Sequence, residues 1–335
     1  MRRLRLTVAA TLAASLLLAG CGDDKDSNDD GEGAKQVGDG AELSSTWPLT
    51  GLPVESDGSS ELERPVLVVK MDNTYSSQPQ IGLSKADMVV EELVEGGMTR
   101  LAAFYYSEIP DNAGPVRSMR ASDIGIVKPV DARMVTSGAA AVTIARLQKA
   151  GIKFYGEGTK GSYRDSGRSA PYNLFVRLGE LAKSLEKGEA KRPDDYLPWG
   201  EEADLPKGRR AKTLAASFSG GHTTNWTFSA GKYRNDNSYA DDGDEFVADT
   251  VLVLRVKVGD AGYRDPAGNP VPETKFEGTG AALVFHKGRL VRGTWAKSKA
   301  DSALTLRTKA GELTIPAGHV FIELVPADGG NVTFK

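Results

Sequence analysis

The sequence predicts an α+β fold, a layered mixed sheet with helices on one side in the N-terminal part, followed by a β-rich C-terminal part. Two observations predict it. Between residues 65 and 187, short apolar runs of strand length alternate with segments of helical spacing, whereas after residue 213 nearly every patterned segment looks like a strand. The 335 residues and the 40% hydrophobic content are enough for two domains with sizeable cores.

The N-terminus has the parts of a secretory signal. Three arginines among the first five residues precede an apolar run, residues 6–18, that is shorter than a membrane span. The run ends in the tetrad LAGC, which resembles the lipobox of bacterial lipoproteins and supplies the only cysteine, Cys21. In lipoproteins this cysteine becomes the first residue and carries the lipids, palmitate among them. The alternative is an ordinary signal peptide with a chance cysteine. The resemblance implies an extracytoplasmic protein anchored to the cell membrane.

The segment that follows is acidic and poor in apolar residues. Between residues 22 and 34 there are six acidic side chains and one lysine. Such a composition cannot bury enough apolar surface to order itself, so it predicts a flexible tether. The whole-chain net charge of −3 gives no case for nucleic-acid binding, and a lone cysteine excludes an intrachain disulfide. The expected parts are a signal peptide at 1–20, a disordered tether at 21–46, an α/β domain at 47–190, a linker at 191–212 and a β-rich domain at 213–335.

The elements of the N-terminal part follow from hydrophobic spacing and turn residues. Strands are predicted at 65–71, 88–95, 100–107 and 132–136, and helices at 118–128, 139–149 and 176–187. The first strand ends at Asp72 and Asn73, and a glycine pair makes the second and third strands a hairpin. Pro129 stops the first helix and Gly151 closes the second, while the polar, glycine-rich residues 156–172 predict a surface loop.

The C-terminal part contains mostly β-branched and aromatic runs separated by turn residues. Strands are predicted at 223–229, 250–258, 281–286, 289–296, 304–307, 312–315 and 320–325. Lys287-Gly288 and Ala310-Gly311 predict hairpin turns.

Several sequence blocks occur in a characteristic order: PLTGLP, VVKMDN, QIGLSKADMVVEELVEGGMTR, GPVRSMR, SGRSAPYNLF and GTWAKS…AGELTIPAGHVFIELVP. They cover about residues 49–326 and resemble the YerB-like bacterial lipoproteins, a family built around a domain of unknown function. The resemblance implies a mixed α/β body with layered sheets, and engagement of other proteins, but no established reaction. Family members often have Pro-His-Asn where this chain has Pro171-Tyr172-Asn173, which argues against an obligatory acid, base or metal ligand here.

The turn GPVRSMR, residues 114–120, is the densest local signal for a site. It joins a strand to a helix and carries Arg117 and Arg120. Free N–H groups at a helix start favour an anion, and arginine presents a planar fork to carboxylate or phosphate. The alternative is a structural ion pair between Arg117 and one of the acids Asp72, Glu91, Glu92 and Asp123.

Strand direction decides which residues join this turn. If the strands at 65–71 and 100–107 run parallel, Asp72 shares a sheet edge with the turn, and Asp87 also lies near Arg117. Arg100 then lies about 20 Å away, at roughly 3.3 Å per residue, and pairs near the 95–97 turn. The ligand-binding residues predicted on this basis are Asp72, Asn73, Arg117 and Arg120, with Tyr172 and Asn173 as a lid.

Other motifs lack their structural context. GEGTKG at 156–161 spells GxGxxG without a following helix, and Ser184 begins an SxxK without partner motifs. The three histidines have no metal-ligand spacing, so neither a metal nor a cofactor is predicted. The tryptophans, Trp295 above all, could stack on sugars, with core packing as the alternative.

Two functions fit these observations. The first is a non-enzymatic envelope lipoprotein that binds a partner protein or an anionic cell-wall component through the strand-end, helix-start site. The second is a cell-wall hydrolase or transferase in which Asp72 is the acid or base and the arginines hold an anion. A second carboxylate meeting Asp72 in a pocket with both arginines would favour the enzyme, and a buried Arg117 ion pair would disfavour it.

Overall fold

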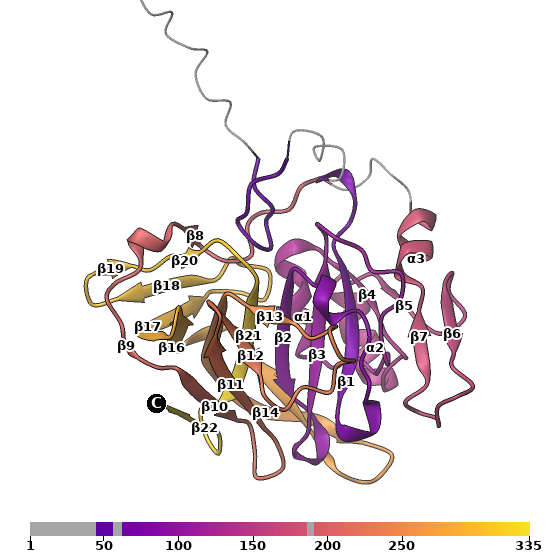
Figure 1. Cartoon of the computed structure of the whole chain (residues 1–335). Helices are drawn as coiled ribbons and strands as arrows, with labels where there is room; N and C mark the ends of the chain where they lie inside the picture. Colours follow the sequence, from indigo (N-terminus) through magenta and orange to yellow (C-terminus); the bar gives the residue numbers. More distant parts are fainter. Residues whose placement is uncertain (1–44, 56–61, 186–190) are drawn as a thin grey trace, which may run out of the picture. The chain divides into compact units, whose positions relative to one another are not determined.

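A thirteen-stranded mixed sheet forms the centre of the fold (Figure 1). Its N-terminal strands are β1 (Leu67–Asn73), β2 (Met88–Leu93), β3 (Thr99–Tyr105), β4 (Arg133–Val135) and β5 (Phe154–Tyr155). Its C-terminal strands are β9 (Arg209–Arg210), β14 (Thr250–Arg264), β15 (Pro270–Lys275), β16 (Gly278–His286), β17 (Arg289–Lys297), β18 (Thr305–Thr308), β19 (Gly311–Glu312) and β21 (Val320–Pro326). The order along the main path is β19-β18-β17-β16-β14-β21-β2-β3-β1-β4-β5.

This computed structural model describes residues 45–55, 62–185 and 191–335. The predicted signal peptide, Cys21 and nearly all of the predicted tether therefore lie outside the described residues. No helix within the described ranges is long and apolar enough to cross a membrane. The two predicted domains share the central sheet, because β2 and β21 pair in parallel with Val90 opposite Ile322. The domain boundaries stay predictions.

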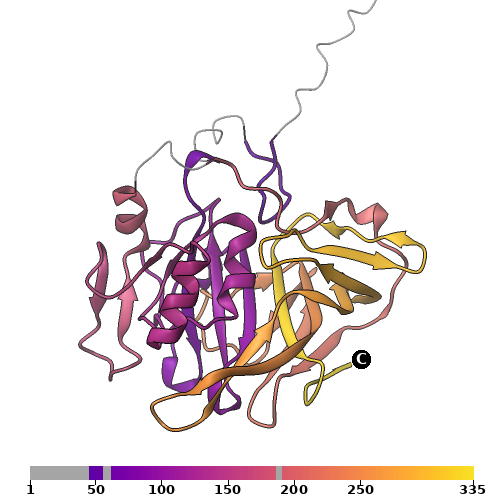
Figure 2. The same ribbon diagram turned by 180° about the vertical axis from the view of Figure 1, so that it is seen from behind.

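Both faces of the central sheet are covered. Along β1, Val68 faces one hydrophobic core while Leu67 and Val69 face the other, and β14 alternates in the same way. Helices α1 (Asp123–Val127) and α2 (Ala141–Lys149) cover the first face, which we call the helix face; Figure 2 shows α2 in front of the sheet. The confirmed class is thus α+β with a β-rich C-terminal part.

A smaller five-stranded sheet covers the opposite face, which we call the small-sheet face. Its order is β13 (Val247–Ala248), β12 (Lys232–Asn235), β11 (Thr223–Ser229), β10 (Thr213–Ser217) and β22 (Asn331–Phe334). Helix α3 (Leu178–Ser184) and the pair β6 (Ser162–Arg164) and β7 (Leu174–Val176) add to the same core. The last pair is β8 (Trp199–Gly200) with β20 (Ile315–Pro316), and the 3-10 turns are η2 (Tyr75–Ser77), η3 (Leu83–Lys85), η4 (Glu95–Gly97), η5 (Lys128–Val130) and η6 (Glu202–Asp204).

The first helix is shorter than its sequence pattern predicted. It was expected at residues 118–128, but α1 covers only Asp123–Val127. The preceding backbone is used by the sheet and its loops, because Arg117 N donates to Lys70 O and Met119 N donates to Gly138 O. The first bond continues the contact with β1, and the second takes up one N–H group of the predicted helix start.

Candidate functional site

Strands β1, β3 and β2 are apolar along most of their length and ionisable at one end. Because β3 runs antiparallel to both neighbours, Arg100 lies opposite both Asp72 and Glu92. The period-two alternation of a strand then divides these residues between the two faces of the sheet. The helix face receives Lys70, Asp72, Glu92 and Arg100, and the small-sheet face receives Asn73, Glu91 and Thr99.

The antiparallel pairing corrects two sequence predictions. Arg100 was expected about 20 Å from Asp72 on the assumption of parallel strands, but it is the register partner of Asp72. Asp87 was expected near Arg117, but it lies at the opposite end of the sheet and accepts hydrogen bonds from Tyr106 N (2.6 Å) and Ser107 N (3.0 Å). Both errors have the same cause. The strands were assumed to be parallel, and in an antiparallel pair the start of one strand lies beside the end of the other.

Glu95 joins the two buried arginines. Arg120 donates through Nε to Glu95 Oε2 (2.9 Å) and through a second nitrogen to Oε1, and Arg100 pairs with Oε1 at 3.2 Å. Burial raises the pKa of Glu95, but the Arg120 hydrogen bond and both guanidinium charges outweigh it and lower that pKa overall. Burial and the Arg120 charge lower the pKa of Arg100 to about 10. Arg100 therefore pairs at the 95–97 turn, as predicted, and the shared Glu95 also joins it to Arg120, which was not predicted.

Arg117 makes the structural ion pair that was the alternative to a ligand contact. Its Nε lies 3.4 Å from Asp72 Oδ2, and 16% of the Arg117 side chain is exposed. The guanidinium also lies 4.8 Å from the centre of the Tyr172 ring and donates to Pro171 O at 3.3 Å. The structure therefore brings Asp72, Arg117 and Tyr172 together, with the Tyr172 ring against the Arg117 guanidinium.

Asn73 and Asn173 lie apart from that group. Asn73 Nδ2 faces the small-sheet side and donates to Glu91 Oε1 (2.9 Å) and Thr99 Oγ1 (2.9 Å). Asn173 Oδ1 accepts a hydrogen bond from Arg164 at 2.6 Å, on the β6–β7 hairpin. The six predicted ligand-binding residues thus fall into separate clusters, and their ligand-binding roles stay predictions.

A buried ionic triad on the helix face was missed by sequence reasoning. Lys70 Nζ lies 2.5 Å from Glu92 Oε1 and 2.7 Å from Asp123 Oδ1, and all three side chains are fully buried. Burial, which outweighs the nearby ammonium, raises the pKa of Glu92. Among the described residues, Glu92 Oε2 has no hydrogen-bond partner. The available signal was a lysine inside a run that otherwise reads as a buried strand.

A second buried cluster on the small-sheet face was also missed. Glu91 and Glu323 are register partners on β2 and β21, and both are fully buried. His222 Nε2 lies 2.8 Å from Glu91 Oε1, and Trp226 Nε1 donates to Glu323 Oε1 at 2.7 Å. Burial and the Glu91 charge raise the pKa of Glu323. Burial alone would lower the pKa of His222, but the Glu91 carboxylate outweighs it and raises that pKa.

Trp295 belongs to the core and is unavailable to a sugar. It is 1% exposed, packs against Phe276 with ring centres 5.8 Å apart, and donates to Arg255 O at 3.0 Å. Within the described part of the chain, no group of three or more His, Cys, Asp or Glu residues could hold a metal ion.

A cavity of about 490 Å³, the arginine-turn cavity, opens beside the turn. The turn contributes Ser118 and Arg120, and the loop before α2 contributes Ser137. Arg264 and its neighbours close the cavity from the β14–β15 hairpin, which Figure 2 shows reaching towards α2. Helix α2 begins after Ala140, which has no side-chain cap bond to the helix, and Ala139 and Ala140 line the cavity. Guanidinium and hydroxyl donors suit a carboxylate or phosphate, and Asp265 is the one carboxylate among the lining residues.

Comparisons with known proteins place this fold among related chains. Two models of one family match, described as the N-terminal and C-terminal domains of "Protein of unknown function (DUF3048)", at residues 49–191 and 214–322. "Putative lipoprotein YerB" of Bacillus subtilis (strain 168) is 25% identical over 289 residues, covering 83% of this chain and 86% of the relative. The crystal structure of YerB protein from Bacillus subtilis matches with a TM-score of 0.70 and 21% identity, over 86% of this chain and 99% of that chain, which shows a shared fold.

Proposed function

The chain belongs to the YerB-like family with DUF3048 N- and C-terminal domains, and from this premise we propose that it is an extracytoplasmic, lipid-anchored protein that binds an anionic ligand of the cell envelope. The LAGC tetrad that ends at Cys21 and the lipoprotein name of its relative support the anchor. The arginine-turn cavity supports the ligand.

The anchor is tested by removing the lipid acceptor. In cells supplied with labelled palmitate, the wild-type chain should carry label and sediment with membranes. Cys21→Ser should carry no label, which separates loss of lipidation from retention by an uncleaved signal peptide. Labelling of Cys21→Ser equal to that of the wild type would contradict the anchor.

The arginine-turn cavity carries the ligand proposal because its donors converge from three segments. Arg120 is fixed by Glu95, Arg264 reaches in from the hairpin, and Ser118 and Ser137 lie with their hydroxyl oxygens 3.2 Å apart. A fixed guanidinium loses little side-chain entropy on binding an anion. In this proposal Asp72, Arg117 and Tyr172 hold the turn, and Arg120 is the predicted residue that meets the ligand.

The geometry supports binding better than hydrolysis or transfer. A glycosidase places two carboxylates across an open site, about 5–9.5 Å apart. Asp72 is instead 3% exposed, accepts from the Thr74 hydroxyl and pairs with Arg117. Glu95, Glu92 and Asp123 are each engaged by a buried cation. The alternative enzyme therefore has no specific observation in its favour among the described residues.

The ligand proposal is tested on the mature chain, residues 21–335 with Cys21→Ser, by calorimetric titration with a muropeptide mixture and, separately, with inorganic phosphate. Arg264→Gln removes one donor and should weaken binding about tenfold, since a charged hydrogen bond is worth about 1.5–3 kcal/mol. Arg234→Gln is the matched control, because Arg234 is exposed on β12, outside the cavity. Equal binding by Arg264→Gln and the wild type would contradict this site.

A further inference from the structure

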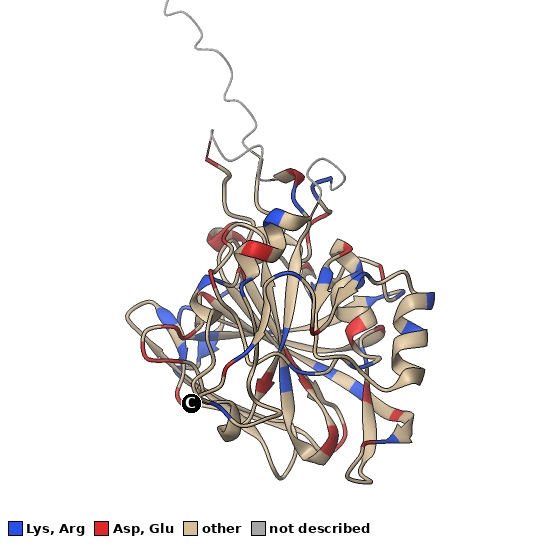
Figure 3. Cartoon of the chain, turned by 90° about the vertical axis from the view of Figure 1, so that its right-hand side faces the viewer, with Lys and Arg blue, Asp and Glu red and all other residues tan. Residues whose placement is uncertain are grey.

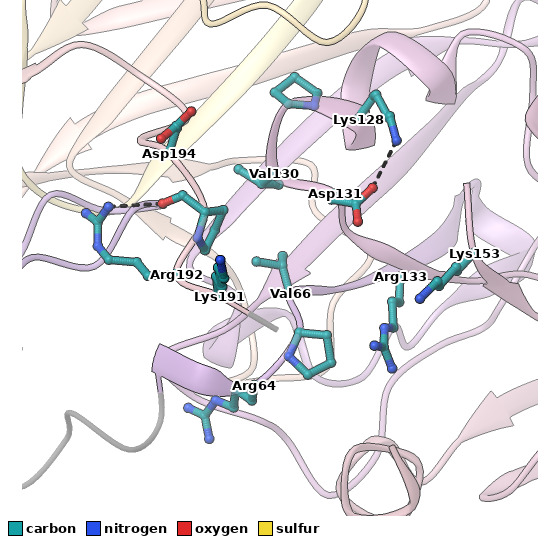
Figure 4. Close-up of a pocket in the computed structure, with 13 residues that line it drawn as sticks. Arg64, Val66, Lys128, Val130, Asp131, Arg133, Lys153, Lys191, Arg192 and Asp194 are labelled. Atoms are coloured by element: carbon teal, nitrogen blue, oxygen red, sulfur yellow. Dashed lines mark hydrogen bonds and ion pairs between the residues drawn. The ribbon is translucent and has the colours of Figure 1, made fainter. Parts of the chain in front are cut away.

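A strongly basic cavity lies at the opposite end of β1 from Asp72 (Figure 4). Its volume is about 620 Å³. The lining has six cationic and two acidic side chains, an excess of four positive charges: Arg64, Lys128, Arg133, Lys153, Lys191 and Arg192 against Asp131 and Asp194. In the view of Figure 3, Lys and Arg positions lie among Asp and Glu positions along the ribbon, whereas the lining of this cavity has three times as many basic as acidic residues.

The fold assembles the cavity from segments that each contribute one or two cations. Strands β1, β4 and β5 run parallel, and Arg133 N donates to Val66 O at 2.8 Å. The β4–β5 register places Arg133 beside Lys153, just before the paired residues Met134 and Phe154. Arg64 precedes β1, and Lys191 reaches in from the segment before β8, as Figure 4 shows.

The cations of the cavity differ in the ion pairs and hydrogen bonds that they make within the fold. Lys128 pairs with Asp131 at 3.0 Å, and Arg192 pairs with Asp195 at 2.6 Å. Arg64 is fixed by bonds to Tyr106 O (2.6 Å) and Ser107 O (2.7 Å). Lys153 and Lys191 are exposed, and within the described ranges neither ammonium has an ion-pair partner. Two lysines are thus available for an anion, with fixed guanidinium groups beside them.

An apolar groove of about 300 Å³ adjoins the basic cavity and shares Arg64 and Pro65 with it. Its apolar lining comes from Leu67, Ile109, Ala182 and Leu185. A small inorganic anion would use the basic cavity alone. A molecule with an anionic head and a hydrocarbon part could occupy both spaces and bury apolar surface at the same time.

We propose that the basic cavity and this groove form one site for a phosphate-bearing amphiphile, the chemistry of an anionic phospholipid. The phosphate lies among Lys153, Lys191 and the guanidinium groups, and the adjoining hydrocarbon lies against Ile109 and Ala182. Basic clusters recognise anionic lipid headgroups by the same charge complementarity. This site is separate from the arginine-turn cavity and does not depend on the function proposed for it.

The test uses the mature chain, residues 21–335 with Cys21→Ser, and monomeric short-chain phosphatidylglycerol. Lys153→Glu/Lys191→Glu should weaken binding about tenfold or more, since each basic side chain near an anionic headgroup contributes about 1 kcal/mol. Lys160→Glu/Lys309→Glu makes the same change in net charge at two exposed lysines outside the cavity and should bind like the wild type. Ile109→Ser should weaken phosphatidylglycerol binding but not inorganic phosphate binding.

Three outcomes would overturn the proposal. Equal losses in the two double variants would mean that only net charge matters. Equal binding of short-chain phosphatidylcholine would mean that the headgroup charge is not recognised. Inorganic phosphate binding as tightly as phosphatidylglycerol, with no effect of Ile109→Ser, would leave a phosphate site without an amphiphile. Lys153→Gln/Lys191→Gln repeats the test with a smaller change, should the charge reversal impair folding.

Discussion

At the carboxyl end of β1, four cations meet four carboxylates in ion pairs, whereas at its amino end six cations line a cavity with two carboxylates. The paired set is mostly buried: Lys70, Arg100, Arg117 and Arg120 with Asp72, Glu92, Glu95 and Asp123. Burying an ion is costly unless a partner compensates it, so the paired cations are tied to the fold. The exposed lysines of the cavity, Lys153 and Lys191, need no partner to fold and can attract a ligand.

Removing one buried cation is the strongest test of the difference between the two ends of β1. Lys70→Met leaves Glu92 and Asp123 buried without their ammonium, and we expect it to lower the free energy of unfolding by about 3–5 kcal/mol. Lys153→Met, the matched substitution at the amino end, should change it by less than about 0.5 kcal/mol. Urea denaturation measures both. Equal midpoints for Lys70→Met and the wild type would contradict a stabilising role for the triad.

The carboxylate pair on the small-sheet face makes stability depend on pH. Burial and the Glu91 charge raise the pKa of Glu323 above its ordinary value of 4.5. Above that pH the unfolded chain loses this proton while the folded chain keeps it. The free energy of unfolding should therefore fall as pH rises, by at most about 1.4 kcal/mol per pH unit, until the folded pKa is passed.

Glu323→Gln should remove this part of the pH dependence, because glutamine resembles the protonated acid and its oxygen can still accept from Trp226 Nε1. In Glu323→Gln, the part of the decrease in the free energy of unfolding with rising pH that comes from His222 should persist. Its raised pKa gives stability that is complete below 6.5 and is lost as pH rises through the folded pKa. Glu91 acts at acid pH, where its lowered pKa gives stability that is lost as pH falls. Parallel pH curves for Glu323→Gln and the wild type would contradict the role of Glu323.

Much of the fold could be predicted from the sequence, because strands buried on both faces are continuous apolar runs. The direction in which the strands pair could not be predicted. The antiparallel pairing places Arg100 opposite Asp72, and it places Asp87 at the end of the sheet far from Arg117. The buried ion pairs could not be predicted either, because partners such as Lys70 and Asp123 lie 53 positions apart in the sequence. The basic cavity takes only one or two cations from each segment, so no stretch of sequence appears strongly basic.

Arg117 is intermediate between the buried, ion-paired cations and the exposed lysines, because it has an ion-pair partner but is not fully buried. We expect Arg117→Ala to lower the free energy of unfolding by about 2 kcal/mol, because Asp72 loses a charged partner. Tyr172→Leu removes only the ring contact and should cost about 0.5–1 kcal/mol. Both are measured by urea denaturation beside ligand titration. Lost ligand binding with unchanged stability in Arg117→Ala would instead favour the direct ligand contact predicted from sequence.

The smallest expected effect lies at the amino end and has the opposite sign. Lys153→Ala/Lys191→Ala removes two exposed cations from a cavity with excess positive charge, so we expect the free energy of unfolding to stay equal or rise by up to about 0.5 kcal/mol. At about 0.1 M salt the screening length is about 10 Å, so salt should raise wild-type stability more than that of the variant. Thermal unfolding at low and high sodium chloride measures the difference. A marked loss of stability in the variant at low salt would show that these lysines have structural partners, as Lys70 does, and would remove the contrast between the two ends of β1.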